Sequence, residues 1–146
     1  MTLPREGMSS ITRTALFPRR SRDDMMGQAA SQWSAFAWEV AKSLEVVAMR
    51  DESGFRAPIT SEGTRAMPFW SSLSRAVKLT ETVPAYRGFE PVVISWESFR
   101  DNWLPGLVKD GFLVGVNWSG PRATGYDVAP QEVAQRIEYE IEQLHT

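Results

Sequence analysis

The feature that most constrains how this chain can fold is the placement of its tryptophans. Four of the six, Trp70, Trp96, Trp103 and Trp118, lie on segments between residues 66 and 118 that have the pattern of strand ends and helix starts. Indole rings bury large apolar areas, and a chain of 146 residues is long enough to enclose a real core. The sequence has no cysteine, so packing alone must stabilise the fold. We therefore expect most of these rings to be structural.

The side chains that usually carry chemistry near neutral pH are almost missing from this sequence. The absence of cysteine excludes thiolate nucleophiles and Cys-ligated metal sites. The single histidine, His145, lies near the C-terminus, where an imidazole suits the negative end of a helix better than catalysis. The sequence also has no phosphate-binding glycine loop, dinucleotide motif, nucleophile elbow or paired metal-ligand motif. We predict a protein that is not an enzyme and that needs no metal or cofactor.

Charge is distributed unevenly along the chain. Residues 1–22 contain five arginines and one glutamate, so the remaining residues carry a net charge of −6. The first segment has two prolines and no apolar periodicity, which predicts a flexible Arg-rich leader over residues 1–23 and a single domain over 24–146. The leader is a candidate for nucleic-acid contact, but an acidic body repels phosphate, so we expect no nucleic-acid partner.

No segment of the sequence has the character of a membrane anchor or an export signal. No apolar run approaches the roughly 20 residues that cross a bilayer. The N-terminus has basic residues but lacks the continuous apolar stretch of a secretory signal. We therefore predict a cytoplasmic protein with no membrane partner.

Apolar spacing predicts an α+β fold with a mixed, mostly antiparallel sheet of about five strands and four helices in one domain. The first helix is expected over residues 24–44, with an apolar stripe that ends at Leu44. A meander of three antiparallel strands should follow, then strands around Val92–Ile94 and residues 112–116. The remaining helices are predicted over residues 71–80, 96–107 and 130–144.

Several local signals refine this prediction. The inner face of the second helix should include Leu73, and the run Val92–Ile94 is typical of a strand covered on both faces. Pro105 should break or kink the third helix near Leu104 because it cannot donate to the preceding turn. Residues 120–127 have the composition of an irregular loop.

One family resembles this sequence in two separate motifs. The first is Met67-Pro68-Phe69-Trp70-Ser71-Ser72 followed by Ala76, and the second begins at Trp96-Glu97-Ser98-Phe99 and ends at Val114-Gly115-Val116-Asn117. Both are similar to an uncharacterised bacterial family, the domain of unknown function twenty-seven fifty. A weaker likeness connects the first motif to the N-terminal domain of SseB-like secretion-enhancer proteins. The resemblance covers residues 30–144 and implies no catalytic residue, and Ser71 stands where the family often has proline.

The corner formed by Trp70, Ser72 and Arg75 is the first candidate site. It joins a strand end to a helix start, where free backbone amides and a guanidinium can hold an anion. The alternative is that Ser72 simply caps the helix.

Trp118 is the tryptophan that periodicity explains least, and it defines the second candidate site. With Asn117 and Arg122 on one loop and Tyr86 on another, it could form an exposed recognition patch, since Trp, Tyr and Arg dominate binding hot spots. The alternative is that Trp118 covers the core.

Two hypotheses for function follow from these candidates. The first is a non-enzymatic cytoplasmic module, of accessory or immunity type, that binds another protein through loop aromatics. The second is a small-molecule or anion-binding domain that uses the corner from Trp70 to Arg75.

Overall fold

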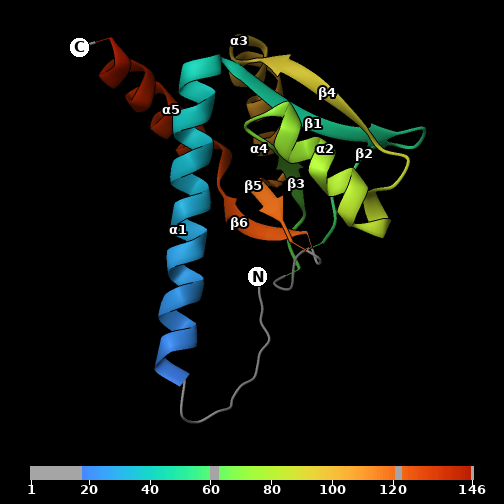
Figure 1. The fold of residues 1–146 in the computed structure, drawn as a ribbon. Coiled ribbons are helices and arrows are strands. Elements are labelled where there is room, and N and C mark those ends of the chain that lie inside the picture. The colour runs from blue at the N-terminus through green and yellow to red at the C-terminus, as the bar shows by residue number, and fades with distance from the viewer. Residues whose placement is uncertain (1–17, 60–62, 121–122, 146) are drawn as a thin grey trace.

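The computed structural model describes residues 18–59, 63–120 and 123–145, and for residues 18–29 and Thr124 it describes the backbone alone. Figure 1 shows a long first helix beside a body of short strands and further helices. In chain order the elements are α1 (Pro18–Ser43), β1 (Glu45–Asp51), β2 (Gly54–Phe55), β3 (Ala66–Phe69), α2 (Leu73–Thr82), η1 (Pro84–Tyr86), β4 (Glu90–Ser95), α3 (Trp96–Ser98), η2 (Phe99–Trp103), α4 (Leu104–Asp110), β5 (Leu113–Ser119), β6 (Thr124–Val128) and α5 (Pro130–Leu144).

The first helix begins earlier than the apolar stripe suggests. Helix α1 begins at Pro18, six residues before the expected start, and residues 1–17 of the predicted leader lie outside the described residues. Its central positions Phe36, Ala37 and Val40 are buried, as their spacing predicts. Leu44 was expected to extend this stripe but is exposed, because it lies past the helix end in the left-handed region with φ 59°.

The α+β class is confirmed, but the strands form two sheets. Their orders are β2-β1-β4 and β3-β5-β6, so there are six strands in place of one sheet of about five. A pair of 2.8 Å backbone hydrogen bonds between Val47 and Trp70 joins the two sheets. Because α3, η2 and α4 follow one another without a break, the helices group into the four predicted segments.

The predicted meander is only half right. The hairpin between β1 and β2 forms, with Arg50 opposite Phe55. Strand β3, however, pairs in parallel with β5, from Ala66 opposite Leu113 onward. Strand β2 ends after two residues. Beyond it, an isolated bridge between Ile59 and Arg65 and a 3.0 Å hydrogen bond from the Ala66 N–H to the Pro58 carbonyl connect the chain to the start of β3, too little to hold β3 in the first sheet.

Alternating residues of the central strands belong to two separate cores. Val46 and Ala48 of β1 point into a core formed with α1, α5 and the α3–α4 segment, while Val47 and Met49 point into a second core beneath α2 and η1. Figure 1 shows α2 in front of the strands and α4 behind them. Helices thus cover both faces of β1, and the second core contains Trp70, Tyr86 and Trp118.

Strand β4 is an edge strand, so our prediction that it is covered on both faces is wrong. Val93 is 49% exposed. Val47, which lies opposite Val93, forms its backbone hydrogen bonds with Trp70 and not with β4. The backbone groups of Val93 therefore point away from β1, and so do those of Pro91, two residues earlier. Pro91 has no N–H to offer, and it therefore blunts this edge against pairing with another strand.

Residues 124–128, which composition assigned to a loop, form strand β6. It pairs with β5 in a hairpin that is irregular between Val116 and Ser119. The loop prediction is wrong because Gly125, which is a turn signal by composition, is needed inside this strand. A side chain at that position would collide with Trp118.

The third helical segment changes its hydrogen-bond pattern before Pro105 but continues past Leu104 without the break that we predicted. The chain forms a π-helical turn over Phe99–Trp103 directly before α4, and Gly111, with φ 74°, ends the helix. A missing donor at Pro105 leaves the preceding carbonyls without their usual partner, which favours such a bulge. In the part of the chain that is described, no helix combines the length and the apolar character needed to span a bilayer.

Candidate functional site

Trp70 lies at the joint between the two sheets and is completely buried. Its backbone bonds to Val47, and its indole Nε1 donates a 2.8 Å hydrogen bond to the carbonyl oxygen of Trp118. Trp70 therefore satisfies its polar atom within the protein, and its contacts hold the corner together.

Ser72 caps helix α2, as one of the two alternatives predicted. Its hydroxyl accepts a 3.3 Å hydrogen bond from the backbone N–H of Arg75. The buried residues of this helix are Ala76 and Leu79, whereas Leu73, which we expected on the inner face, is half exposed. The buried stripe of α2 therefore begins at Ala76, and Leu73 at the start of the helix faces solvent.

The guanidinium of Arg75 is bound by Glu39, a residue that our sequence analysis did not select. Its Nε and Nη2 donate to both carboxylate oxygens of Glu39 on α1, at 2.9 and 2.7 Å. The Arg75 hydrogen bond is the main cause that lowers the pKa of Glu39; a hydrogen bond from Ser71 and the charge of Lys42 act in the same direction, against partial burial. The same pair raises the pKa of Arg75. Glu39 therefore stays ionised beside the corner.

Ser71 and Asn117 extend this network into the protein interior. Asn117, with φ 50°, accepts a 2.9 Å hydrogen bond from the backbone N–H of Ser71 and donates one of 3.0 Å to its hydroxyl. The Ser71 hydroxyl in turn donates to Glu39. On the other side, Gln32 donates to the carbonyl of Asn117 at 3.2 Å. Asn117 thus belongs with the corner, although we had grouped it with Trp118.

Trp118 is buried, so the exposed recognition patch that we expected around it is not present. The indole is 8% exposed and lies against Gly115 and Gly125. Its Nε1 donates a 3.1 Å hydrogen bond to Asp127. The alternative interpretation, in which Trp118 covers the core, describes this geometry.

Tyr86 is buried as well, because residues 84–86 form a short helix under α2 in place of a loop. Its ring meets that of Trp70 edge-on, with centroids 6.1 Å apart. Burial raises the pKa of Tyr86, although the charge of Arg56 and a side-chain hydrogen bond with it act in the opposite direction. Arg122, the last member of the expected patch, lies outside the described residues.

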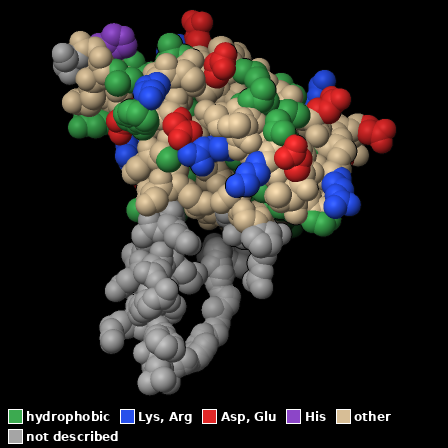
Figure 2. Space-filling view, viewed as in Figure 1, with side chains coloured by type: hydrophobic (Ala, Val, Ile, Leu, Met, Phe, Trp, Pro, Cys, Tyr) green, Lys and Arg blue, Asp and Glu red, His purple; other side chains and the backbone are tan. Residues whose placement is uncertain are grey.

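An open hollow of about 570 Å³ lies between α1 and α2, and we call it the α1–α2 groove. Trp38 stands beside this groove on α1 and is 48% exposed. The ammonium of Lys42 lies 3.7 Å from the centroid of its ring. Figure 2 shows that this side of the molecule carries interspersed acidic and basic side chains with scattered hydrophobic ones. The groove is lined by Glu39, Lys42, Ser43, Ser71, Ser72, Ser74 and Arg75.

Two further observations bear on chemistry. Within the described residues, no group of three or more His, Asp or Glu side chains is arranged to hold a metal ion. The acidic and basic side chains at the corner, Glu39 and Arg75, are bonded to one another.

Comparison with known proteins places most of the chain in one family. No curated protein matches the chain. Residues 33–137, which contain both motifs, the corner and nearly all of both cores, match the family described as "Protein of unknown function (DUF2750)". The chain belongs to this family, the one that its two tryptophan-containing motifs resemble.

Proposed function

We propose that this protein is a non-enzymatic binding module that recognises a short acidic segment of another protein in the α1–α2 groove. The observation that carries the proposal is Trp38, a large aromatic side chain that stays half exposed beside the groove while the other indoles of the body pack inside. Exposed tryptophans with a cation nearby are typical of binding hot spots.

Charge selects the kind of partner. The groove is lined by one carboxylate, that of Glu39, and by two cations, Lys42 and Arg75. The groove therefore has a net positive charge, whereas the net charge of the whole chain is −2. A complementary partner carries acidic residues that reach the groove, and a hollow of about 570 Å³ admits only a short segment.

The serines of the groove add polar contacts without adding charge. Ser72 and Ser74 lie within 3.3 Å of each other at the start of α2, and both line the groove. Hydroxyls can donate to a carboxylate or to a peptide carbonyl. The apolar contact comes from Trp38, which is half exposed beside the groove. We therefore expect the recognised segment to combine acidic residues with at least one apolar residue.

The anion-binding alternative meets an obstacle at the same corner. The Glu39 carboxylate already occupies the two guanidinium nitrogens that a small anion would use. A free phosphate or sulfate would have to displace a carboxylate that the fold holds in place, whereas a peptide can gain from Trp38 and Lys42 as well.

A selection from a random peptide library tests this function. Wild-type protein is used for selection, and the double variant Trp38→Ser with Lys42→Gln is used for counter-selection. We expect enriched peptides that contain Asp or Glu beside an apolar residue and that bind the double variant at least about tenfold more weakly. Tyr139→Ser is the matched control, because Tyr139 is 55% exposed on α5, away from the groove.

Two outcomes would contradict the proposal. Enriched peptides that lack acidic residues, or that bind the double variant as well as wild type, would remove the groove as the recognition surface. Saturable binding of inorganic phosphate that Arg75→Gln abolishes would instead support the anion-binding domain.

A further inference from the structure

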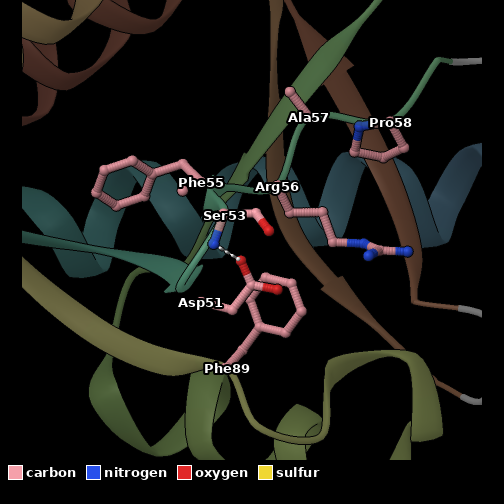
Figure 3. Close-up of a pocket in the computed structure, with 8 residues that line it drawn as sticks. Asp51, Ser53, Phe55, Arg56, Ala57, Pro58 and Phe89 are labelled. Atoms are coloured by element: carbon pink, nitrogen blue, oxygen red, sulfur yellow. Dashed lines mark hydrogen bonds between the residues drawn. The ribbon is translucent and has the colours of Figure 1, made fainter.

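A second hollow, of about 350 Å³, lies at the hairpin between β1 and β2. It is independent of the α1–α2 groove, because the two hollows have no residue in common. Figure 3 shows charged and aromatic side chains around it. The hollow is lined by Asp51, Ser53, Gly54, Phe55, Arg56, Ala57, Pro58 and Phe89.

Arg56 differs from the three arginines that form ion pairs in the described part of the chain. Arg75, Arg100 and Arg136 each donate Nε to a carboxylate. The Nε of Arg56 is buried without a hydrogen-bond partner, and no described carboxylate forms an ion pair with this side chain. The side-chain partner of Arg56 is the neutral Tyr86 hydroxyl. A partly buried guanidinium without a counter-charge is unfavourable, so the site favours a ligand that supplies a negative charge.

Aromatic rings fix the position of this guanidinium. The Arg56 Cζ lies 5.0 Å from the centroid of Tyr86 and 5.7 Å from that of Phe89. Stacking on aromatic faces is a common way to hold arginine in place, and it restricts the directions from which an anion can approach. Phe89 also lines the hollow, so it offers an apolar surface next to the charge.

Asp51 limits the charge that a ligand can carry. One of its carboxylate oxygens accepts a 2.9 Å hydrogen bond from the backbone N–H of Ser53, which holds the carboxylate at the hairpin turn. Figure 3 shows the Arg56 side chain extending away from Asp51, and the two do not form an ion pair. A second negative charge on a ligand would face Asp51 across the same hollow, so a monoanion is preferred to a dianion.

We propose that this hollow is a binding site for a monocarboxylate that carries a flat apolar group. The carboxylate bonds to the guanidinium of Arg56, and the apolar group lies on Phe89. Free carboxylic acids and the carboxylate of a peptide share this chemistry.

Titration of the full-length protein with benzoate tests the site. Backbone amide shifts of Ser53 and Ala57, followed by NMR, report the binding, and inorganic phosphate and benzylamine are the comparison probes. We expect benzoate to bind in preference to both, Arg56→Gln to weaken it by about tenfold or more, and Asp51→Asn to strengthen it several-fold while improving phosphate binding. Arg87→Gln removes the same charge from the exposed turn before Phe89 and should leave the affinity within about twofold.

The proposal is overturned if folded wild type shows no saturable benzoate shift, or if phosphate binds as well as benzoate. It is also overturned if Arg56→Gln or Asp51→Asn binds benzoate like wild type. Should Arg56→Gln fail to fold, the Asp51→Asn result decides, since an asparagine can still accept the hydrogen bond from Ser53. A titration of N-acetylphenylalanine into Trp38→Ser distinguishes the two hollows. This variant should bind N-acetylphenylalanine like wild type, even if it has lost the peptide binding proposed for the α1–α2 groove.

Discussion

Replacement of Gly115 by alanine is the sharpest test of the packing around Trp118. An ideal Cβ at Gly115 would lie 2.4 to 2.5 Å from three atoms of the indole. Carbon atoms in contact prefer about 3.5–4.0 Å, so the ring or the strand must shift by about 1 Å. The indole has little freedom to do so, because Asp127 holds its Nε1 and Gly125 lies against it from the neighbouring strand.

The expected cost follows from these constraints. Overpacking in a closed core costs about 1–3 kcal/mol, and a displaced indole also weakens its hydrogen bond to Asp127, a contribution of about 1 kcal/mol. We expect Gly115→Ala to lower the free energy of unfolding by about 3 kcal/mol. For a chain of this size that corresponds to a drop of about 10 °C in the melting temperature.

Urea denaturation of four proteins measures this effect as a double-mutant cycle. Wild type, Gly115→Ala, Trp118→Ala and the double variant are compared, and the same alanine should cost less than about 1 kcal/mol once the indole is gone. Gly106→Ala is the matched control, because its Cβ would meet nothing within 4 Å in helix α4, and it should stabilise by about 0.5–1 kcal/mol. Additive effects of Gly115→Ala and Trp118→Ala would refute the proposed clash.

Three further variants test the corner and the second core. Asn117→Ala should cost about 2–4 kcal/mol in urea denaturation, because it leaves the buried N–H of Ser71 without its partner and places alanine at positive φ, whereas Asn117→Gly should cost about 1 kcal/mol less. The lowered pKa of Glu39 means that its contribution is present above its usual value of 4.5 and is lost as the pH falls below it, so Glu39→Gln should flatten the acid limb of a stability profile. The raised pKa of Tyr86 has the opposite sign, with stability present below its usual value of 10.0 and lost as the pH rises above it, so Tyr86→Phe should unfold at higher pH than wild type in an alkaline titration.

The parts of the fold that sequence predicted correctly are those set by local chemistry. Ser72 caps α2, Gly111 ends the helical segment after Pro105, and Pro130 begins α5. Each of these residues acts on backbone groups within one helical turn of itself. Their effects are therefore visible without knowledge of the tertiary structure.

The parts that sequence missed are set by partners far along the chain. Strand β6 includes Gly125, which is a turn signal locally but is required here because Trp118 and the carbonyl of Val116 leave no room for a Cβ. Glu39 was missed for a related reason. Its partners Ser71 and Arg75 lie more than 30 positions away, and nothing in a charged residue on an amphipathic helix reveals such a contact.

One backbone position explains why the structural joint at the corner lies next to the proposed recognition surface. In a regular strand Val116 and Trp118 would share a face, but the irregularity at Asn117 places Val116 in the core under α1 and Trp118 in the core under α2. The same turn brings the Asn117 amide to Ser71 and the Trp118 carbonyl to Trp70. These inner residues therefore hold both cores together, and substitutions there should reduce stability before they affect binding. Lys42, which lines the α1–α2 groove, and Trp38, which lies against it, should show the reverse, with a normal urea midpoint and a loss of peptide binding.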